Sequence, residues 1–162
     1  MIFDKFQLIE NLINIALDED LKDGDPSSEI IFKNSKSEYN LILKEDAVIS
    51  GVEVFKYVLK KIDGNLIFSN FVEDSFQKKG VMGKIIGNEV SILSAERTAL
   101  NFIQRMSSVA TSTFNLKNLM KNPNVELIDT RKTIPGWRIL DKYSVLVGGG
   151  KNHRMNLGEQ IM

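Results

Sequence analysis

Apolar positions in the first part of the chain follow two periods. Helical spacing over residues 4–17 and 52–62 predicts two amphipathic helices. Alternation with polar residues over 39–43 predicts a half-buried strand. Two short apolar runs, at 66–68 and 81–86, predict further strands, and we expect glycines to break the second of them. This mixture of helices and strands is typical of an α+β unit.

A long helical pattern follows. We expect Ser91 or Ser94 to cap a helix that continues to about residue 110. A second helix is expected over 113–120, because Pro123 cannot continue it.

The last part of the chain alternates strand and helix patterns. A short apolar strand is expected at 125–128, directly before Asp129. The next helix starts near Trp137 and ends at the glycines 148–150, and residues 160–162 resemble the entry to another strand. In parallel α/β folds ligands bind at the carboxyl ends of strands, so the residues after 128 are candidates for a site.

An acidic, turn-rich stretch at 18–28 separates the first helix from the strands. Its carboxylates suggest calcium, but an EF-hand loop needs glycine at its sixth position, where Asp23 stands when counting from Asp18. We therefore interpret the stretch as a capped, solvated loop.

Composition narrows the class of protein. The 162 residues suffice for one substantial core or two small ones, and no apolar run approaches the roughly 18 residues that cross a membrane. The start, Met1 to Lys5, does not resemble a signal peptide, and there is no cysteine for disulfides or thiolate chemistry. We expect a cytoplasmic protein that binds neither membrane nor nucleic acid.

Charge is unevenly distributed. Residues 1–96 hold 11 Lys+Arg and 17 Asp+Glu (net −6), whereas residues 97–162 hold 10 and 4 (net +6). Most of the excess lies between Asp129 and Arg154, where Asp141 is the only other acid. The basic side chains there are Arg131, Lys132, Arg138, Lys142, Lys151, His153 and Arg154. Adjacent cations repel unless solvated or sharing an anion, so this segment predicts a site for a ligand with several negative charges.

Some of these residues have simpler interpretations. Arg138 and Lys142 are four residues apart on a helix face, which favours solvated side chains. The glycine triplet alone could be only a helix stop. Lys151 is close enough to contact phosphate but is not assigned a role. A single histidine is often structural, but His153 lies between Asn152 and Arg154, which favours a function.

Three blocks resemble the signature blocks of quinolinate phosphoribosyltransferase, also called nicotinate-nucleotide pyrophosphorylase (carboxylating). They are Asp-Thr-Arg-Lys-Thr-x-Pro-Gly at 129–136, Gly-Gly-Gly-Lys-Asn-His-Arg at 148–154 and Ala-Glu-Arg-Thr-Ala-Leu-Asn-Phe at 95–102. The loop from Glu19 to Ser28 resembles the N-terminal block of the same family. The chain aligns in order with the first half of the family.

The resemblance implies an N-terminal α/β sandwich domain and the start of an incomplete TIM-like α/β barrel. We expect residues 1–110 to form the first domain with its connecting helix, and 111–162 to belong to the barrel. The resemblance also implies a homodimer with active sites at the subunit interface. Because relatives continue through most of the barrel, we expect this chain to be a truncated form, inactive without the missing part.

The implied reaction transfers a phosphoribosyl group from phosphoribosyl pyrophosphate to quinolinate, with decarboxylation to nicotinate mononucleotide. Mg²⁺ would enter with phosphoribosyl pyrophosphate, since no metal motif occurs in this segment. The resemblance implies that Arg97 (from the partner subunit), Arg131, His153 and Arg154 hold the quinolinate carboxylates, with Thr130 and Lys132 as further donors. Lys132 and His153 are the expected catalytic residues. Arginine suits carboxylates because its planar fork binds them bidentately.

Two alternatives stay open. A related pyrophosphorylase of the molybdenum-operon branch would act on another anionic acceptor. An inactive fragment would only dimerise through the N-terminal domain. The Lys-Asn-His-Arg block at 151–154 favours quinolinate over the first alternative.

Overall fold

The computed structural model describes residues 6–32 and 35–159. The helices are α1 (Phe6–Leu21), α2 (Pro26–Ile31), α3 (Val52–Ile62), α4 (Glu89–Leu119) and α5 (Arg138–Val147). The strands are β1 (Lys36–Leu43), β2 (Ala47–Val48), β3 (Ile67–Ser69), β4 (Phe76–Gln77) and β5 (Gly80–Asn88). The expected combination of helices and strands is therefore confirmed. Among the described residues, no helix combines the length and the apolar character needed to span a membrane.

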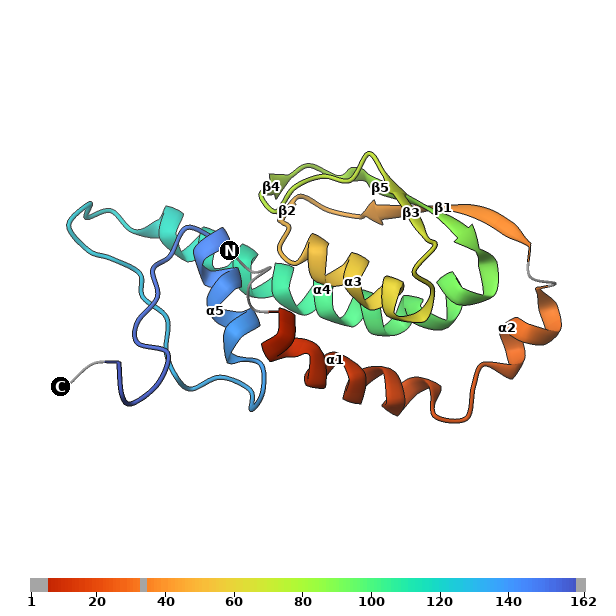
Figure 1. Cartoon of the computed structure of the whole chain (residues 1–162). Helices are drawn as coiled ribbons and strands as arrows, with labels where there is room; N and C mark the ends of the chain where they lie inside the picture. The colour runs from red at the N-terminus through yellow and green to blue at the C-terminus, as the bar shows by residue number, and fades with distance from the viewer. Residues whose placement is uncertain (1–5, 33–34, 160–162) are drawn as a thin grey trace.

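The main sheet has three antiparallel strands in the order β1-β5-β3, and β2 pairs with β4 in a second small sheet. Tyr39 and Phe68 both pair with Ile85, which places β5 in the centre. The sheet lies on one side of α3 and α4, and α1 lies on the other side of α4 (Figure 1). α5 and the chain after α4 extend from one end of this layered body.

The core fills the space between the sheet and the helices. Ile13 of α1, Phe55 of α3 and Phe102 of α4 are each at most 2% exposed. Leu140 of α5 belongs to the same apolar cluster, so the segment after α4 is joined to the main core. Trp137, just before α5, stacks on Phe102 with ring centroids 4.9 Å apart. The last part of the chain therefore has an apolar attachment to the first.

α4 differs from the expected pair of helices. It is one continuous helix of 31 residues, so the predicted break between residues 110 and 113 is wrong. The Thr113 hydroxyl donates to the Val109 carbonyl at 2.8 Å, which satisfies this polar side chain inside the helix. The predicted cap is also wrong: the Asn88 side chain accepts from the Ser91 N–H and caps the helix.

The glycines of β5 do not break the strand. β5 continues through Gly83 and Gly87, and an added Cβ at these positions would overlap the Phe71 ring and the Leu66 side chain, respectively. The prediction of a broken strand is therefore wrong. These glycines let neighbouring side chains pack directly on the strand backbone.

Two further expectations fail in detail. The stretch 18–28 is mostly helical, because α1 continues to Leu21 and Asp25 caps α2 by accepting the Ser28 N–H at 3.0 Å. Residues 125–128 do not form a strand; only Ile128 makes an isolated parallel bridge, with Lys151. A strand forms only when a second segment pairs with it along its length. In the described chain, Lys151 is the single bridge partner of Ile128. The expected strand entry at 160–162 lies outside the described residues.

Candidate functional site

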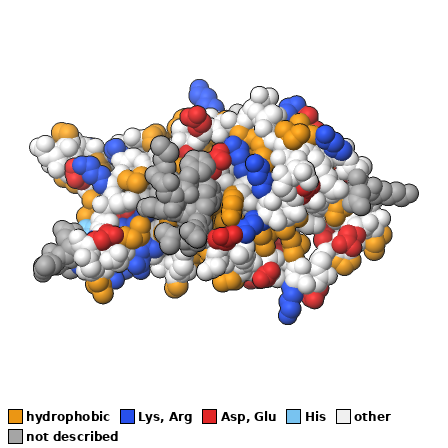
Figure 2. Space-filling model, viewed as in Figure 1, with side chains coloured by type: hydrophobic (Ala, Val, Ile, Leu, Met, Phe, Trp, Pro, Cys, Tyr) orange, Lys and Arg blue, Asp and Glu red, His pale blue; other side chains and the backbone are white. Residues whose placement is uncertain are grey.

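A short parallel bridge between Ile128 and Lys151 brings two cationic blocks side by side. The first block is residues 129–136, and the second is residues 148–154. The Lys151 N–H donates to the Leu127 carbonyl at 2.8 Å, and the Asp129 N–H donates to the Lys151 carbonyl at 3.0 Å. The residues after Asp129 and those after Lys151 therefore leave the bridge at the same edge. In Figure 2, basic side chains are spread over the face that is shown, and some of them lie at the end of the molecule that holds α5.

Asp129 organises this edge. Its Oδ1 accepts from the Lys142 ammonium at 2.5 Å and from the His153 N–H at 2.8 Å. With the Asn152 amide oriented so that its nitrogen faces acceptors, this nitrogen donates to Asp129 Oδ2 at 2.8 Å. Both oxygens of the carboxylate are thus occupied by neighbours from the second block and from α5. Asp129 is positioned as a structural acceptor for this edge.

Lys142 is buried, and the prediction of a solvated side chain is wrong. The Lys142 side chain is 1% exposed and the Asp129 side chain 5% exposed. The ammonium also donates to the His153 carbonyl at 2.8 Å. A buried ammonium has to be surrounded by oxygen acceptors because desolvation is otherwise too costly.

Arg138 is not a freely solvated side chain either. It is half-buried, and its two terminal nitrogens donate to the Met155 carbonyl at 3.1 Å and the Arg131 carbonyl at 3.4 Å. The side chain thus links the backbone of the first cationic block to that of the residue directly after the second. Helical spacing gave no indication of this role, because the acceptors are backbone carbonyls in loops.

The residues assigned to the site lie around this framework. Thr130 and Lys132 are exposed, and the Thr130 hydroxyl accepts the Lys132 N–H at 3.2 Å. Arg131 is half-buried, and its Nε, like that of Arg138, is buried without a hydrogen-bond partner among residues 6–32 and 35–159. A buried N–H that lacks an acceptor costs roughly 1–3 kcal/mol. An anion at this position would remove that cost.

The His153 imidazole has a defined hydrogen bond. Its Nδ1 accepts the Arg154 N–H at 2.8 Å. In the neutral ring the proton therefore resides on Nε2, which is free to donate. Such a donor suits a carboxylate ligand, and the bridge between Ile128 and Lys151 places its loop beside the loop that carries Arg131.

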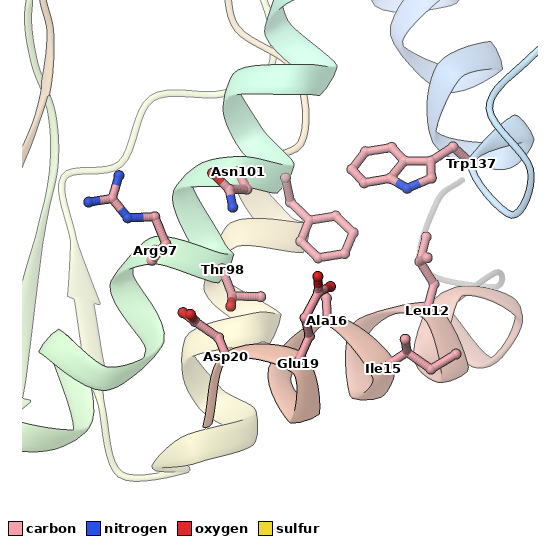
Figure 3. Close-up of a pocket in the computed structure, with 10 residues that line it drawn as sticks. Leu12, Ile15, Ala16, Glu19, Asp20, Arg97, Thr98, Asn101 and Trp137 are labelled. Atoms are coloured by element: carbon pink, nitrogen blue, oxygen red, sulfur yellow. The ribbon is translucent and has the colours of Figure 1, made fainter. Parts of the chain in front are cut away.

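Arg97 is the one assigned residue that lies apart from this edge. It is exposed on α4, in a pocket of about 350 Å³ that it shares with Glu19 and Asp20 of α1 and with Trp137 (Figure 3). Arg97 makes no hydrogen bond or ion pair to any part of the chain that the structure describes. A role in a shared site would require it to act on another subunit.

Three residues that sequence reasoning did not assign are therefore part of the site framework: Arg138, Lys142 and Asn152. The sequence held one indication of the Lys142 contact. Asp129 is an acid within a cationic segment, and a buried acid needs a cation as its partner. By contrast, Lys151 lies outside this framework and pairs with exposed Glu126. Gly149 follows α5 with a φ of +86°, in the left-handed region, as a glycine that ends a helix does.

Comparison with known proteins extends these observations. The profile of the quinolinate phosphoribosyl transferase N-terminal domain matches residues 25–107, and the profile of its C-terminal domain matches residues 109–162. The rice chloroplastic nicotinate-nucleotide pyrophosphorylase [carboxylating] is 39% identical over 158 residues, which cover 95% of this chain and 42% of that protein. A probable nicotinate-nucleotide pyrophosphorylase [carboxylating] from Bacillus subtilis is 35% identical over 156 residues, which cover 95% of this chain and 54% of that protein.

Solved structures agree with the sequence comparisons. The crystal structure of NadC from Streptococcus pyogenes superposes with a TM-score of 0.91 at 36% identity, covering 97% of this chain and 57% of that one. The layered helices and sheet and the segment after them thus share the fold of the first half of this solved structure. The chain belongs to the quinolinate phosphoribosyltransferase family, and it spans about half the length of the relatives it matches.

Proposed function

We propose that this chain supplies the quinolinate-binding part of a quinolinate phosphoribosyltransferase. The reaction joins quinolinate to the ribose of phosphoribosyl pyrophosphate, releases pyrophosphate and carbon dioxide, and gives nicotinate mononucleotide. Because the chain covers 42% to 57% of its relatives, we expect the residues they have beyond the matched part to be required for turnover. We keep residues 1–110 and 111–162 as the proposed domains, joined through α4.

The observation that carries this proposal is the gathering of donors at the edge formed by 130–132 and His153, where Arg131 Nε is buried without an acceptor among the described residues. Asp129, the acid of that edge, is occupied by Lys142, Asn152 and the His153 N–H. These hydrogen bonds do not involve Arg131, whose buried Nε has no acceptor among the described residues. A dicarboxylate such as quinolinate would supply acceptors for these donors.

The same donors suit the chemistry of the reaction. Cleavage of the anomeric C–O bond develops negative charge on pyrophosphate, and fixed cations stabilise such charge without reorganising. We assign Lys132 and His153 as the catalytic residues, with Arg97, Thr130, Arg131 and Arg154 in substrate binding. Lys132 offers an ammonium at the exposed side of the site, and His153 offers its Nε2–H to a carboxylate.

Mg²⁺ is proposed to enter with phosphoribosyl pyrophosphate rather than through ligands of this segment. In residues 6–32 and 35–159 no three His, Asp or Glu side chains lie close enough to hold a metal ion. The cationic edge offers donors rather than oxygen ligands, so it does not suit a resident Mg²⁺. The metal would belong to the pyrophosphate substrate.

Calorimetric titration tests the ligand. We expect the 162-residue chain to bind quinolinate more tightly than nicotinate, which has one carboxylate fewer. Arg131→Ala should weaken quinolinate binding about a hundredfold, because it removes a charge-assisted contact. Lys121→Ala, which removes an exposed cation outside the site, serves as the matched control. Equal and weak binding of both acids would contradict the proposal and favour the molybdenum-operon alternative or a chain that only dimerises.

The proposed homodimer has a separate test. If Arg97 completes the site of the partner subunit, Arg97→Ala and Arg131→Ala should each abolish high-affinity binding. After random subunit exchange half the dimers are mixed, and each mixed dimer has one intact site, so about a quarter of the sites should return. Exchange without any recovered binding would place Arg97 in its own subunit's site or in packing alone.

A further inference from the structure

Lys142 contacts the second cationic block through its side-chain ammonium and through its backbone carbonyl. Its ammonium donates to Asp129 Oδ1 at 2.5 Å and to the His153 carbonyl at 2.8 Å. Its backbone carbonyl accepts the Asn152 amide nitrogen at 2.9 Å in the favoured amide orientation. One residue of α5 is therefore joined to the Asp129 carboxylate and to two consecutive residues, Asn152 and His153, of the loop that carries the histidine.

These contacts hold the His153 backbone on both sides. The N–H donates to Asp129 Oδ1 at 2.8 Å, and the carbonyl accepts from Lys142. With these two backbone groups held, the direction of the imidazole depends on its side-chain rotations, and its Nδ1 already accepts the Arg154 N–H. The direction of the Nε2–H donor therefore depends on the Lys142–Asp129 ion pair.

Burial of this pair is better explained by positioning than by stability. The Lys142 side chain is 1% exposed and that of Asp129 is 5% exposed, so both charges are almost completely desolvated. Replacement of a buried ion pair by apolar residues is commonly neutral or stabilising, because the desolvation cost offsets the attraction. An apolar side chain at position 142 could not make the hydrogen bonds by which Lys142 holds the Asp129 carboxylate and the His153 carbonyl.

We propose that Lys142 is a positioning residue: through Asp129 and the His153 carbonyl, it fixes the orientation in which the 130–132 and 153–154 segments present their donors to a dicarboxylate. The identity of the ligand rests on the proposed function, whereas the geometry does not. Lys142 itself is not expected to touch quinolinate, because its ammonium is enclosed by Asp129 and His153.

The only histidine of the chain makes this proposal directly measurable. Nitrogen NMR of His153 in the wild-type chain should show the neutral ring protonated on Nε2, with Nδ1 as an acceptor. Lys142→Met and the nearly isosteric Asp129→Asn should both shift the two ring nitrogens towards a mixture of tautomers. Lys151→Met is the control, because it removes an ammonium from the same loop, and among the described residues this ammonium pairs with exposed Glu126 alone.

Quinolinate binding provides the second readout. Small misplacements of binding groups cost up to about a hundredfold, so we expect Lys142→Met and Asp129→Asn each to weaken quinolinate binding at least tenfold. The double variant Lys142→Met/Asp129→Asn contains no unpaired buried charge and should recover thermal stability. Its His153 spectrum and its affinity should nevertheless remain those of the single variants.

The outcomes separate positioning from stability and from the proposed function. Recovery of both the spectrum and the affinity in the double variant would show that the pair only stabilises the fold, and would overturn the inference. Unchanged spectra in the single variants, or failure of all three variants to fold, would do the same. If the spectra change as expected but the wild-type chain does not bind quinolinate, the positioning role stands and the proposed function fails.

Discussion

The two regions of this molecule are held together by different interactions. Residues 6–119 are organised around apolar side chains, and Val54 and Val58 of α3 are completely buried. In residues 120–159, Leu140 alone belongs to the buried core, and the loops are fixed by ion pairs and backbone acceptors around Asp129. The candidate donors belong mainly to the second region.

This difference follows from the physics of the two kinds of contact. Apolar burial is non-directional, so it stabilises a layer without specifying where any one polar atom points. Hydrogen bonds and ion pairs are directional, and they can fix a donor to within the tolerance that binding requires. The first region therefore acts as the scaffold, and the second holds groups in place. Substitutions in each region should have different consequences.

The largest effect is expected from a cavity in the apolar region. Phe55→Ala removes a side chain that is 2% exposed and should lower the free energy of unfolding by about 3–5 kcal/mol. Urea denaturation measures this change, and Ile30→Ala is the control because Ile30 is 80% exposed. If the two variants lose similar stability, apolar packing does not dominate this region.

The sequence predicted the scaffold better than the site framework. Helical periodicity gave α3 with the same bounds as the structure, because its buried face repeats regularly. The predicted helix break before Thr113 failed, because a side-chain hydrogen bond satisfies this residue inside α4. The predicted strand break at Gly83 failed as well, because the Phe71 ring packs directly on the strand there. Burial of Lys142 could not be inferred from its helix, since its acceptors come from two loops that only the folded chain brings together.

Asp74 links the two regions. Its carboxylate accepts from the Gly51 and Val52 N–H groups at 2.7 and 2.9 Å, at the start of α3, and from the Tyr143 hydroxyl of α5 at 2.8 Å. Burial and this hydrogen bond raise the pKa of Tyr143. Asp74→Ala should therefore cost about 2–3 kcal/mol in urea denaturation, more than loss of a single helix cap.

Asp46→Ala is the matched control for this link. Asp46 is exposed, and within the described part of the chain it accepts a single hydrogen bond, from the Lys79 N–H at 2.8 Å, so its loss should cost less than about 1 kcal/mol. Hydrogen exchange should show that Asp74→Ala opens α5 as well as the start of α3. Opening confined to α3 would mean that the Tyr143 contact does not couple the regions.

A smaller effect is expected where β5 relies on glycine. Gly83→Ala introduces a methyl group that would overlap the Phe71 ring, so we expect a loss of about 2 kcal/mol from the repacking it forces. Gly64→Ala provides the comparison, because no atom lies within 4 Å of its added Cβ. Thermal denaturation measures both variants. Equal stabilities would show that Phe71 can move away without cost.

The smallest effect concerns a hydrogen bond at the edge of the scaffold. The Tyr39 hydroxyl donates to Glu89 Oε1 at 2.6 Å, and this hydrogen bond, followed by burial, raises the pKa of Tyr39 to about 12 from its usual 10.0. A group whose pKa is raised by folding contributes stability that is fully present below its unfolded pKa and lost as pH rises through its folded pKa.

Tyr39→Phe should thus be about 1 kcal/mol less stable than wild type up to pH 10. Between pH 10 and 12 the difference should shrink towards zero, because the wild-type hydroxyl loses the proton that it donates. Contributions from Tyr143 and the lysines are common to both proteins and cancel in the difference. A difference that stays constant across this range in urea denaturation would mean that ionisation of Tyr39 is not coupled to its bond with Glu89.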